Sequence, residues 1–215
     1  MNKAVIFDMD GVLIDSEIVF TKCLSKAFEA AGYDVPEAEF YRFAGIEFPK
    51  KFQTVINEKN LPVTVEELSV HYRNAQKVLL QDFGVLLKPG VLSTLQALRS
   101  AGYRTALCSN SVQERVDKVF ADTGLTGLFD VVITGEVVPR RKPDPCIYLL
   151  TLDLLGLSPK DCIAVEDSIF GITAAKAAGL VTIELRDPRF PYQDGLADVT
   201  IDNLSQLPKI LERFV

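Results

Sequence analysis

The sequence predicts an α/β protein with a Rossmann-like parallel sheet covered by helices on both faces and an inserted all-helical domain. Short apolar runs rich in β-branched residues alternate with helical patterns from residue 103 onward. Because these runs are continuously apolar, they are typical of strands that are buried on both faces of a parallel sheet. The region between residues 16 and 85 has only helical patterns, which predicts the insertion.

Composition and charge narrow the class of protein. The chain has 215 residues, of which 48% are hydrophobic and 24% charged, and this suffices for one core and a smaller lobe. No apolar run approaches the roughly 20 residues that span a bilayer, so we expect no membrane partner. The net charge of −6 argues against nucleic acid as a binding partner, because proteins bind its phosphates mainly with basic residues. Four cysteines without CxxC spacing predict reduced thiols and a cytoplasmic protein.

The first element, KAVIFD at residues 3–8, is expected to be a core strand, because two aspartates end its apolar run too early for a signal peptide. A helical stripe that ends at Gly32 and helical stretches near 37–44, 48–59 and 65–82 are expected next. We therefore expect residues 1–15 and 85–215 to form the core and residues 16–84 to form the inserted domain. The alternative is that these helices simply cover the sheet.

Strands and helices alternate through the rest of the chain. Apolar residues spaced three and four apart predict helices that stop at Gly102 and Gly124. Ser111 and Ser168 are expected to cap the helices that follow them. The remaining strands are expected at 103–109, 130–134, 161–167, 180–185 and, with a weaker pattern, 197–201.

Polar residues follow four predicted strands, at the ends where open α/β sheets bind ligands. Carboxylates grouped this closely repel one another unless a cation neutralises them, and oxygen ligands shared with a phosphate suit Mg²⁺. Ionised Asp8, Glu166 and Asp167 balance the charges of Mg²⁺ and Lys142, so a phosphate dianion would enter a nearly neutral site. The polar residues are Asp8 and Asp10, then Ser109 and Asn110, then Lys142, and finally Glu166 and Asp167.

The motifs that contain these residues resemble those of the haloacid dehalogenase superfamily, in the branch of sugar-phosphate phosphatases and β-phosphoglucomutase. DMDGVLIDSE resembles the opening DxDGxxxDSE motif, CSN at 108–110 the second motif, KPDP at 142–145 the third and VEDS at 165–168 the acidic fourth. The match covers essentially the whole chain. It implies that the insertion is a helical cap domain, that Mg²⁺ is the cofactor and that the substrate is a small phosphorylated metabolite.

The resemblance implies catalytic roles for the first two acids. Asp8 is expected to attack phosphorus and become an aspartyl phosphate, because a carboxylate is already ionised at neutral pH and needs no base. Asp10 is expected to be the general acid, with a pKa that neighbouring carboxylates and partial burial raise. The resemblance also places the backbone carbonyl of Asp10 on the metal.

The same resemblance assigns the metal and phosphate contacts. Asp167 is expected to bind the metal through its side chain, and Glu166 to bind it directly or through water. Ser109, the backbone amide of Asn110 and Lys142 are expected to hold the phosphoryl oxygens.

The third motif departs from the family pattern. Arg141 precedes Lys142 and Cys146 follows Pro145, where the family commonly has a glycine and an acid. The loss of the acid puts in doubt a contact that orients the lysine. Arg140 and Arg141 are expected either to reach a substrate carboxylate or to lie on the surface, and RRKPDP somewhat resembles 6-phosphogluconate phosphatases.

The cap sequence favours hydrolysis over phosphoryl transfer within one sugar. In the β-phosphoglucomutase-like pattern a His and a basic residue of the cap grip phosphate, whereas this chain has Phe20 at the first position and Pro49 near the second. Lys50 and Lys51 could replace the basic residue after a local shift. We therefore expect a phosphatase, with a phosphomutase as the alternative. A dehalogenase would have no use for Asp10 or for the acidic pair at 166–167, and the intact catalytic motifs argue against a non-catalytic binding protein. The oligomeric state cannot be read from the sequence.

Overall fold

A computed structural model describes residues 3–43, 46, 48–190 and 196–214. Its centre is a six-stranded sheet in the order β3-β2-β1-β4-β5-β6, and every neighbouring pair is parallel. This confirms the predicted fold class, and each strand lies within two residues of its predicted run. The strands are β1 Ala4–Phe7, β2 Arg104–Ser109, β3 Val131–Thr134, β4 Cys162–Glu166, β5 Val181–Leu185 and β6 Val199–Ile201.

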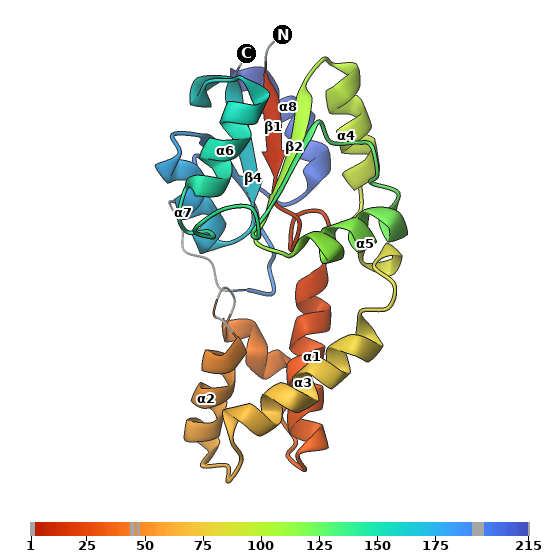
Figure 1. Cartoon of the computed structure of the whole chain (residues 1–215), viewed down its shortest axis with the longest axis vertical. Helices are drawn as coiled ribbons and strands as arrows, with labels where there is room; N and C mark the ends of the chain where they lie inside the picture. The colour runs from red at the N-terminus through yellow and green to blue at the C-terminus, as the bar shows by residue number, and fades with distance from the viewer. Residues whose placement is uncertain (1–2, 44–45, 47, 191–195, 215) are drawn as a thin grey trace. The chain divides into compact units, whose positions relative to one another are not determined.

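Helices cover both faces of the sheet, with α6 and α7 on one face and α4 and α8 on the other (Figure 1). On the first face, alternate residues of β1 and β2 pack against Ile147 and Leu152 of α6 and Ala174 of α7. No helix in the described segments is both long and apolar enough to cross a membrane. The helices are α4 Val91–Ser100, α5 Gln113–Thr123, α6 Cys146–Leu155, α7 Ile169–Ala177 and α8 Leu207–Leu211.

The chain divides into two compact units. The first contains the sheet and comprises Met1–Asp15, Phe83–Asp187 and Tyr192–Val215, and the second comprises Ser16–Asp82 and Pro188–Pro191. The insertion predicted from the sequence spans residues 16–84. The second unit contains α1 Ser16–Ala30, the 3₁₀ segment η1 Glu37–Phe43, α2 Phe48–Lys59 and α3 Val65–Leu79.

Aromatic side chains form the core of the second unit. The ring of Phe28 on α1 lies 5.6 Å from that of Phe52 on α2, which in turn lies 5.9 Å from the ring of Tyr72 on α3. The stretch near 37–44, predicted as a helix, is the 3₁₀ segment η1. Its buried residues, Phe40 and Phe43, are three positions apart, and a repeat of three residues per turn brings both to the same side.

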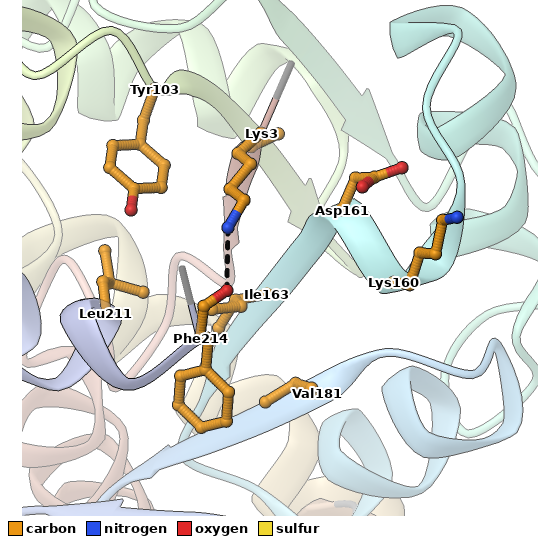
Figure 2. Close-up of a pocket in the computed structure, with 9 residues that line it drawn as sticks. Lys3, Tyr103, Lys160, Asp161, Ile163, Val181, Leu211 and Phe214 are labelled. Carbon is orange, nitrogen blue, oxygen red and sulfur yellow. Dashed lines mark hydrogen bonds between the residues drawn. The ribbon is translucent and has the colours of Figure 1, made fainter. Parts of the chain in front are cut away.

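The two ends of the sheet differ in chemistry. At the amino ends of β1, β4 and β5 lies a small pocket of about 100 Å³, in which the Lys3 ammonium donates to the backbone carbonyl of Phe214 over 2.8 Å (Figure 2). The polar residues singled out by the sequence lie at the opposite, carboxyl ends. Because ligands in this fold class bind outside the carboxyl ends, the candidate site is built there.

Candidate active site

The strand register brings the acids of the first and fourth motifs together. Phe7 at the end of β1 pairs with Val165 of β4, and the amide of Asp8 donates to the carbonyl of Val165 over 3.0 Å. In the sheet, β1 has β2 as its neighbour on one side and β4 as its neighbour on the other. Asp8 and Glu166 therefore lie at the point where the strand order reverses, which is where doubly wound sheets bind ligands.

Lys142 joins these two acids. Its ammonium donates to Asp8 Oδ1 at 2.6 Å, to Glu166 Oε1 at 2.5 Å and to the carbonyl of Cys108 at 2.7 Å. Burial raises the pKa of Asp8 to about 7, although the nearby lysine opposes this shift. Burial disfavours the charged ammonium, yet Asp8 and Glu166 outweigh it and raise the pKa of Lys142. The ammonium thus stays charged and can face an incoming anion.

Three carboxylates form a group that fits a divalent cation. Asp8, Glu166 and Asp167 each offer one oxygen, and these oxygens all lie within 4.8 Å of one another. Glu166 is fully buried, and among the described residues its Oε2 has no hydrogen-bond partner. A buried carboxylate oxygen without a donor is costly, so a hard cation that prefers oxygen ligands would satisfy it.

Two glycines leave the space that these carboxylates occupy. A Cβ on Gly11, which has φ +77°, would lie 1.8 Å from Asp167 Oδ2. A Cβ on Gly171 would lie 2.0 Å from Glu166 Oε2. Any side chain at either position would therefore displace a carboxylate of the group.

Asp10 is held by a guanidinium that the sequence analysis missed. Arg115 donates to Asp10 Oδ1 at 2.6 Å and to Oδ2 at 3.0 Å, and Ser111 donates to Oδ2 at 3.0 Å. Arg115 lies in α5 among other charged residues, so no sequence pattern distinguishes it from a solvent-facing residue. The structure thus adds a cation to the acids that the sequence placed around Asp10.

Of the two serines predicted to cap helices, one does so and the other does not. Ser168 caps α7 as expected, because its hydroxyl accepts from the amide of Gly171. The prediction for Ser111 is wrong: Val112 is the N-cap of α5 and makes no side-chain hydrogen bond there. The hydroxyl of Ser111 points instead to the carboxylate of Asp10, an acceptor that the sequence could not place beside it.

Ser109 and Asn110 lie at the carboxyl end of β2, beside the third motif. Ser109 is buried, and its hydroxyl accepts from the amide of Ser111 over 3.1 Å. The side chain of Asn110 accepts from the amide of Lys142 at 3.0 Å and donates to its carbonyl at 3.3 Å. The second and third motifs are therefore tied together through Asn110, which positions the lysine from its backbone.

Tyr148 of α6 is a second buried contact that the sequence analysis missed. Its hydroxyl donates to Glu166 Oε1 over 2.5 Å, and its ring packs in the core beneath Lys142. An aromatic residue at helical spacing reads as ordinary core, so only the structure identifies the role of the hydroxyl. No contact between Cys146 and the lysine ammonium is found in the described part of the chain.

Arg140 and Arg141 make their hydrogen bonds outside this cluster. Arg140 is exposed and pairs with Asp144, whereas the exposed Arg141 donates to the carbonyl of Gly135 over 3.3 Å. Phe20 of α1 is half-buried and Lys50 of α2 exposed, and both belong to the second unit. The glycine of the cap turn, residue 45, lies outside the described residues.

The sequence of this chain is similar to those of known hydrolases. A family model described as haloacid dehalogenase-like hydrolase matches residues 2–179. A phosphorylated carbohydrates phosphatase from Thermotoga maritima is 33% identical over 189 residues, which cover 84% of this chain and 83% of that protein.

Solved structures agree in fold. A haloacid dehalogenase family hydrolase from Deinococcus radiodurans, crystallised with bound phosphate and sodium, has a TM-score of 0.81, 28% identity and coverage of 99% of this chain and 96% of its own. A β-phosphoglucomutase from Clostridium difficile has a TM-score of 0.73 with 22% identity and covers 100% of this chain and 97% of its own. At that identity the second likeness concerns the fold alone.

Proposed function

The chain belongs to the haloacid dehalogenase-like hydrolase family, and from this membership we propose that it is a Mg²⁺-dependent phosphatase of a small phosphorylated metabolite. The observation that carries the proposal is the contact of Lys142 with Asp8 and Glu166 beside the carboxylate of Asp167. A nucleophile, a fixed cation and a metal-ligand group are thereby joined in one cluster at the carboxyl end of the sheet. Both halves of a phosphoryl-transfer site, attack and charge neutralisation, are supported by these residues.

The proposed reaction has two steps on Asp8. In the first, a carboxylate oxygen of Asp8 bonds to phosphorus, the ester P–O bond breaks, and Asp10 gives a proton to the departing alkoxide. In the second, water attacks the aspartyl phosphate, its proton passes to Asp10, and the P–O bond to Asp8 breaks to release phosphate and restore the carboxylate. Lys142, Ser109 and the amide of Asn110 hold the phosphoryl oxygens in both steps.

Asp8, Glu166 and Asp167, with the backbone carbonyl of Asp10, would hold Mg²⁺. The bound cation would neutralise the carboxylates and the developing phosphoryl charge. Without this neutralisation the three acids would repel a phosphate dianion.

The substrate class proposed is a sugar phosphate or a phosphorylated sugar acid. The Thermotoga relative is named for phosphorylated carbohydrates, and Arg140 and Arg141 offer cations close in sequence to Lys142. We propose that the second unit is the cap domain and that Phe20 and Lys50 contribute to specificity there.

Trapping of the intermediate tests the mechanism. Asp8→Asn keeps the size of the side chain but removes the nucleophile, so release of phosphate from sugar phosphates should fall by several orders of magnitude. Mass spectrometry of the wild type quenched during turnover should locate one phosphoryl group on Asp8. Asp198→Asn, which alters an exposed partner of Lys176, is the control and should keep full activity. Undiminished hydrolysis by Asp8→Asn overturns the mechanism.

A second assay separates phosphatase from phosphomutase. Phe20 occupies the place of a phosphate-gripping His in the mutase pattern, so we expect water to accept the phosphoryl group. The protein is incubated with β-glucose 1-phosphate and a trace of the 1,6-bisphosphate. Release of inorganic phosphate supports the phosphatase, whereas glucose 6-phosphate with little free phosphate identifies a mutase.

A further inference from the structure

We propose that Tyr148 is a positioning residue for the metal site: its hydroxyl fixes Glu166 so that Oε2 is directed to the cation. This inference rests on the proposed function, because it assumes that the acidic group binds a divalent metal. It goes beyond it by assigning a role to a side chain outside the four motifs.

The two oxygens of Glu166 have different surroundings. Oε1 accepts from the Tyr148 hydroxyl and from the Lys142 ammonium, each at 2.5 Å. Oε2 is buried and has no hydrogen-bond partner among the described residues. Since the carboxylate is satisfied on one side only, its geometry leaves Oε2 for a cation.

The lysine alone does not provide this arrangement. An ammonium has three N–H donors, and those of Lys142 go to Asp8, Glu166 and the carbonyl of Cys108. No donor of Lys142 is left to strengthen the contact with Oε1. The hydroxyl of Tyr148 provides the second bond, so it determines how firmly the carboxylate is oriented.

The helix behind the carboxylate prevents an alternative orientation. A Cβ on Gly171 would lie 2.0 Å from Glu166 Oε2 and 2.1 Å from Oε1, which means that the first turn of α7 touches the carboxylate. Glu166 is thus confined between α7 and the Tyr148 hydroxyl of α6. Removal of the Tyr148 hydroxyl would free the Glu166 carboxylate on the α6 side and leave the packing of the ring unchanged.

Tyr148→Phe is the matched probe, because it removes the oxygen and keeps the buried ring. Metal affinity of the protein is measured after EDTA treatment and dialysis, by titration with Mn²⁺ and detection of free Mn²⁺ by electron paramagnetic resonance. We expect the variant to bind Mn²⁺ about 10- to 100-fold more weakly, as is usual when a partner of a metal ligand is removed. Tyr103→Phe, in the pocket at the other end of the sheet, should bind as the wild type does.

A double-mutant cycle tests whether Tyr148 acts through Glu166. In a Glu166→Gln background, Tyr148→Phe should weaken Mn²⁺ binding no further. The single variant Tyr148→Phe should also need more Mg²⁺ for half-maximal phosphatase activity. Its kcat at saturating Mg²⁺ should stay close to that of the wild type.

The outcomes separate this inference from the proposed function. If the wild type binds Mn²⁺ and the folded Tyr148→Phe protein binds it equally well, the role of Tyr148 is overturned and the phosphatase proposal stands. An additive effect in the Glu166→Gln background likewise overturns it. If the wild type binds neither Mn²⁺ nor Mg²⁺, the metal-dependent function itself fails, and the inference fails with it.

Discussion

Lys142 shows how a single residue makes a buried acidic cluster tolerable. Two buried carboxylates would be strongly unfavourable without a cation, because desolvation of each charge costs several kcal/mol. Asp8 and Glu166 share the lysine ammonium at 2.6 and 2.5 Å. The lysine therefore stabilises the buried acids in the protein without metal, and the proposed mechanism gives it a catalytic role as well.

The contact of Arg115 with Asp10 predicts a loss of rate when the arginine is replaced. Arg115→Leu removes the guanidinium fork from Asp10, and loss of such positioning typically costs about 10- to 100-fold in rate. We expect this loss in kcat for sugar phosphates, whose alkoxide must be protonated as it leaves. The burst of nitrophenolate from p-nitrophenyl phosphate, which measures the first step alone, should fall much less, because nitrophenolate leaves without a proton.

The control for Arg115 is another partly exposed arginine of the same unit. Arg99 pairs with Asp130 at 3.2 Å, so Arg99→Leu removes a comparable ion pair away from the site. It should leave both rates unchanged. Equal losses in the first step with the two substrates, measured in a single turnover, would mean that the arginine does not act through Asp10 as the general acid.

Some site residues could be predicted from the sequence and others could not, and the difference depends on the element in which each residue lies. Asp8 and Asp167 directly follow apolar strands, and an acid in that place is conspicuous in the sequence itself. Arg115 and Tyr148 lie within helices, where a charged or aromatic residue is ordinary. Their partners, Asp10 and Glu166, are 105 and 18 residues away, so only the folded structure reveals the contacts.

At the scale of elements, strands were easier to predict than the short helical segments. The residues of β1 to β5 are buried or half-buried, so an apolar run defines each of these strands. Strand β6 contains the exposed Thr200, and η1 is a 3₁₀ segment whose sequence also suits an α-helix. The N-cap of α5 was misassigned because the hydroxyl of Ser111 donates to the carboxylate of Asp10, and Val112 is the N-cap instead. Local hydrogen-bond competition of this kind is decided by tertiary partners.

Gly171 carries the prediction for helix α7. Alanine in a helix interior is normally more stable than glycine by about 0.5–1 kcal/mol, but a Cβ here would meet the Glu166 carboxylate at 2.0 Å. We therefore expect Gly171→Ala to lower the melting temperature and to weaken Mg²⁺ binding at least ~10-fold, as measured by calorimetry.

Thr173→Ala is the matched control, because Thr173 is an exposed residue of the same helix. It should retain the affinity for Mg²⁺ and should not lower the melting temperature. Normal Mg²⁺ binding by Gly171→Ala would mean that the carboxylate has room to move, contrary to the confinement described.

At the scale of the whole molecule, the proposed metal site would link binding of metal to folding of the first unit through Asp8. In the protein without metal, burial raises the pKa of this carboxyl from its ordinary 3.8 to about 7. Between these two values the folded protein holds a proton that the unfolded chain has lost. The contribution of Asp8 to stability is therefore complete below about pH 4 and is lost as the pH rises toward 7.

Under the proposed function, bound Mg²⁺ would reverse this dependence, because a carboxylate must be ionised to bind a metal. At low pH the cation competes with the proton on Asp8, and near pH 7 that competition ends. We expect the difference between the melting temperatures in Mg²⁺ and in EDTA, measured by scanning calorimetry, to widen from about pH 5 to about pH 7.5. Groups that do not touch the metal titrate equally in both solutions and cancel in this difference.

In Asp8→Asn, which has no proton to lose, the difference should vary much less with pH. A wild-type difference that stays constant or narrows over this range would show that Asp8 is not the group through which protons and metal compete.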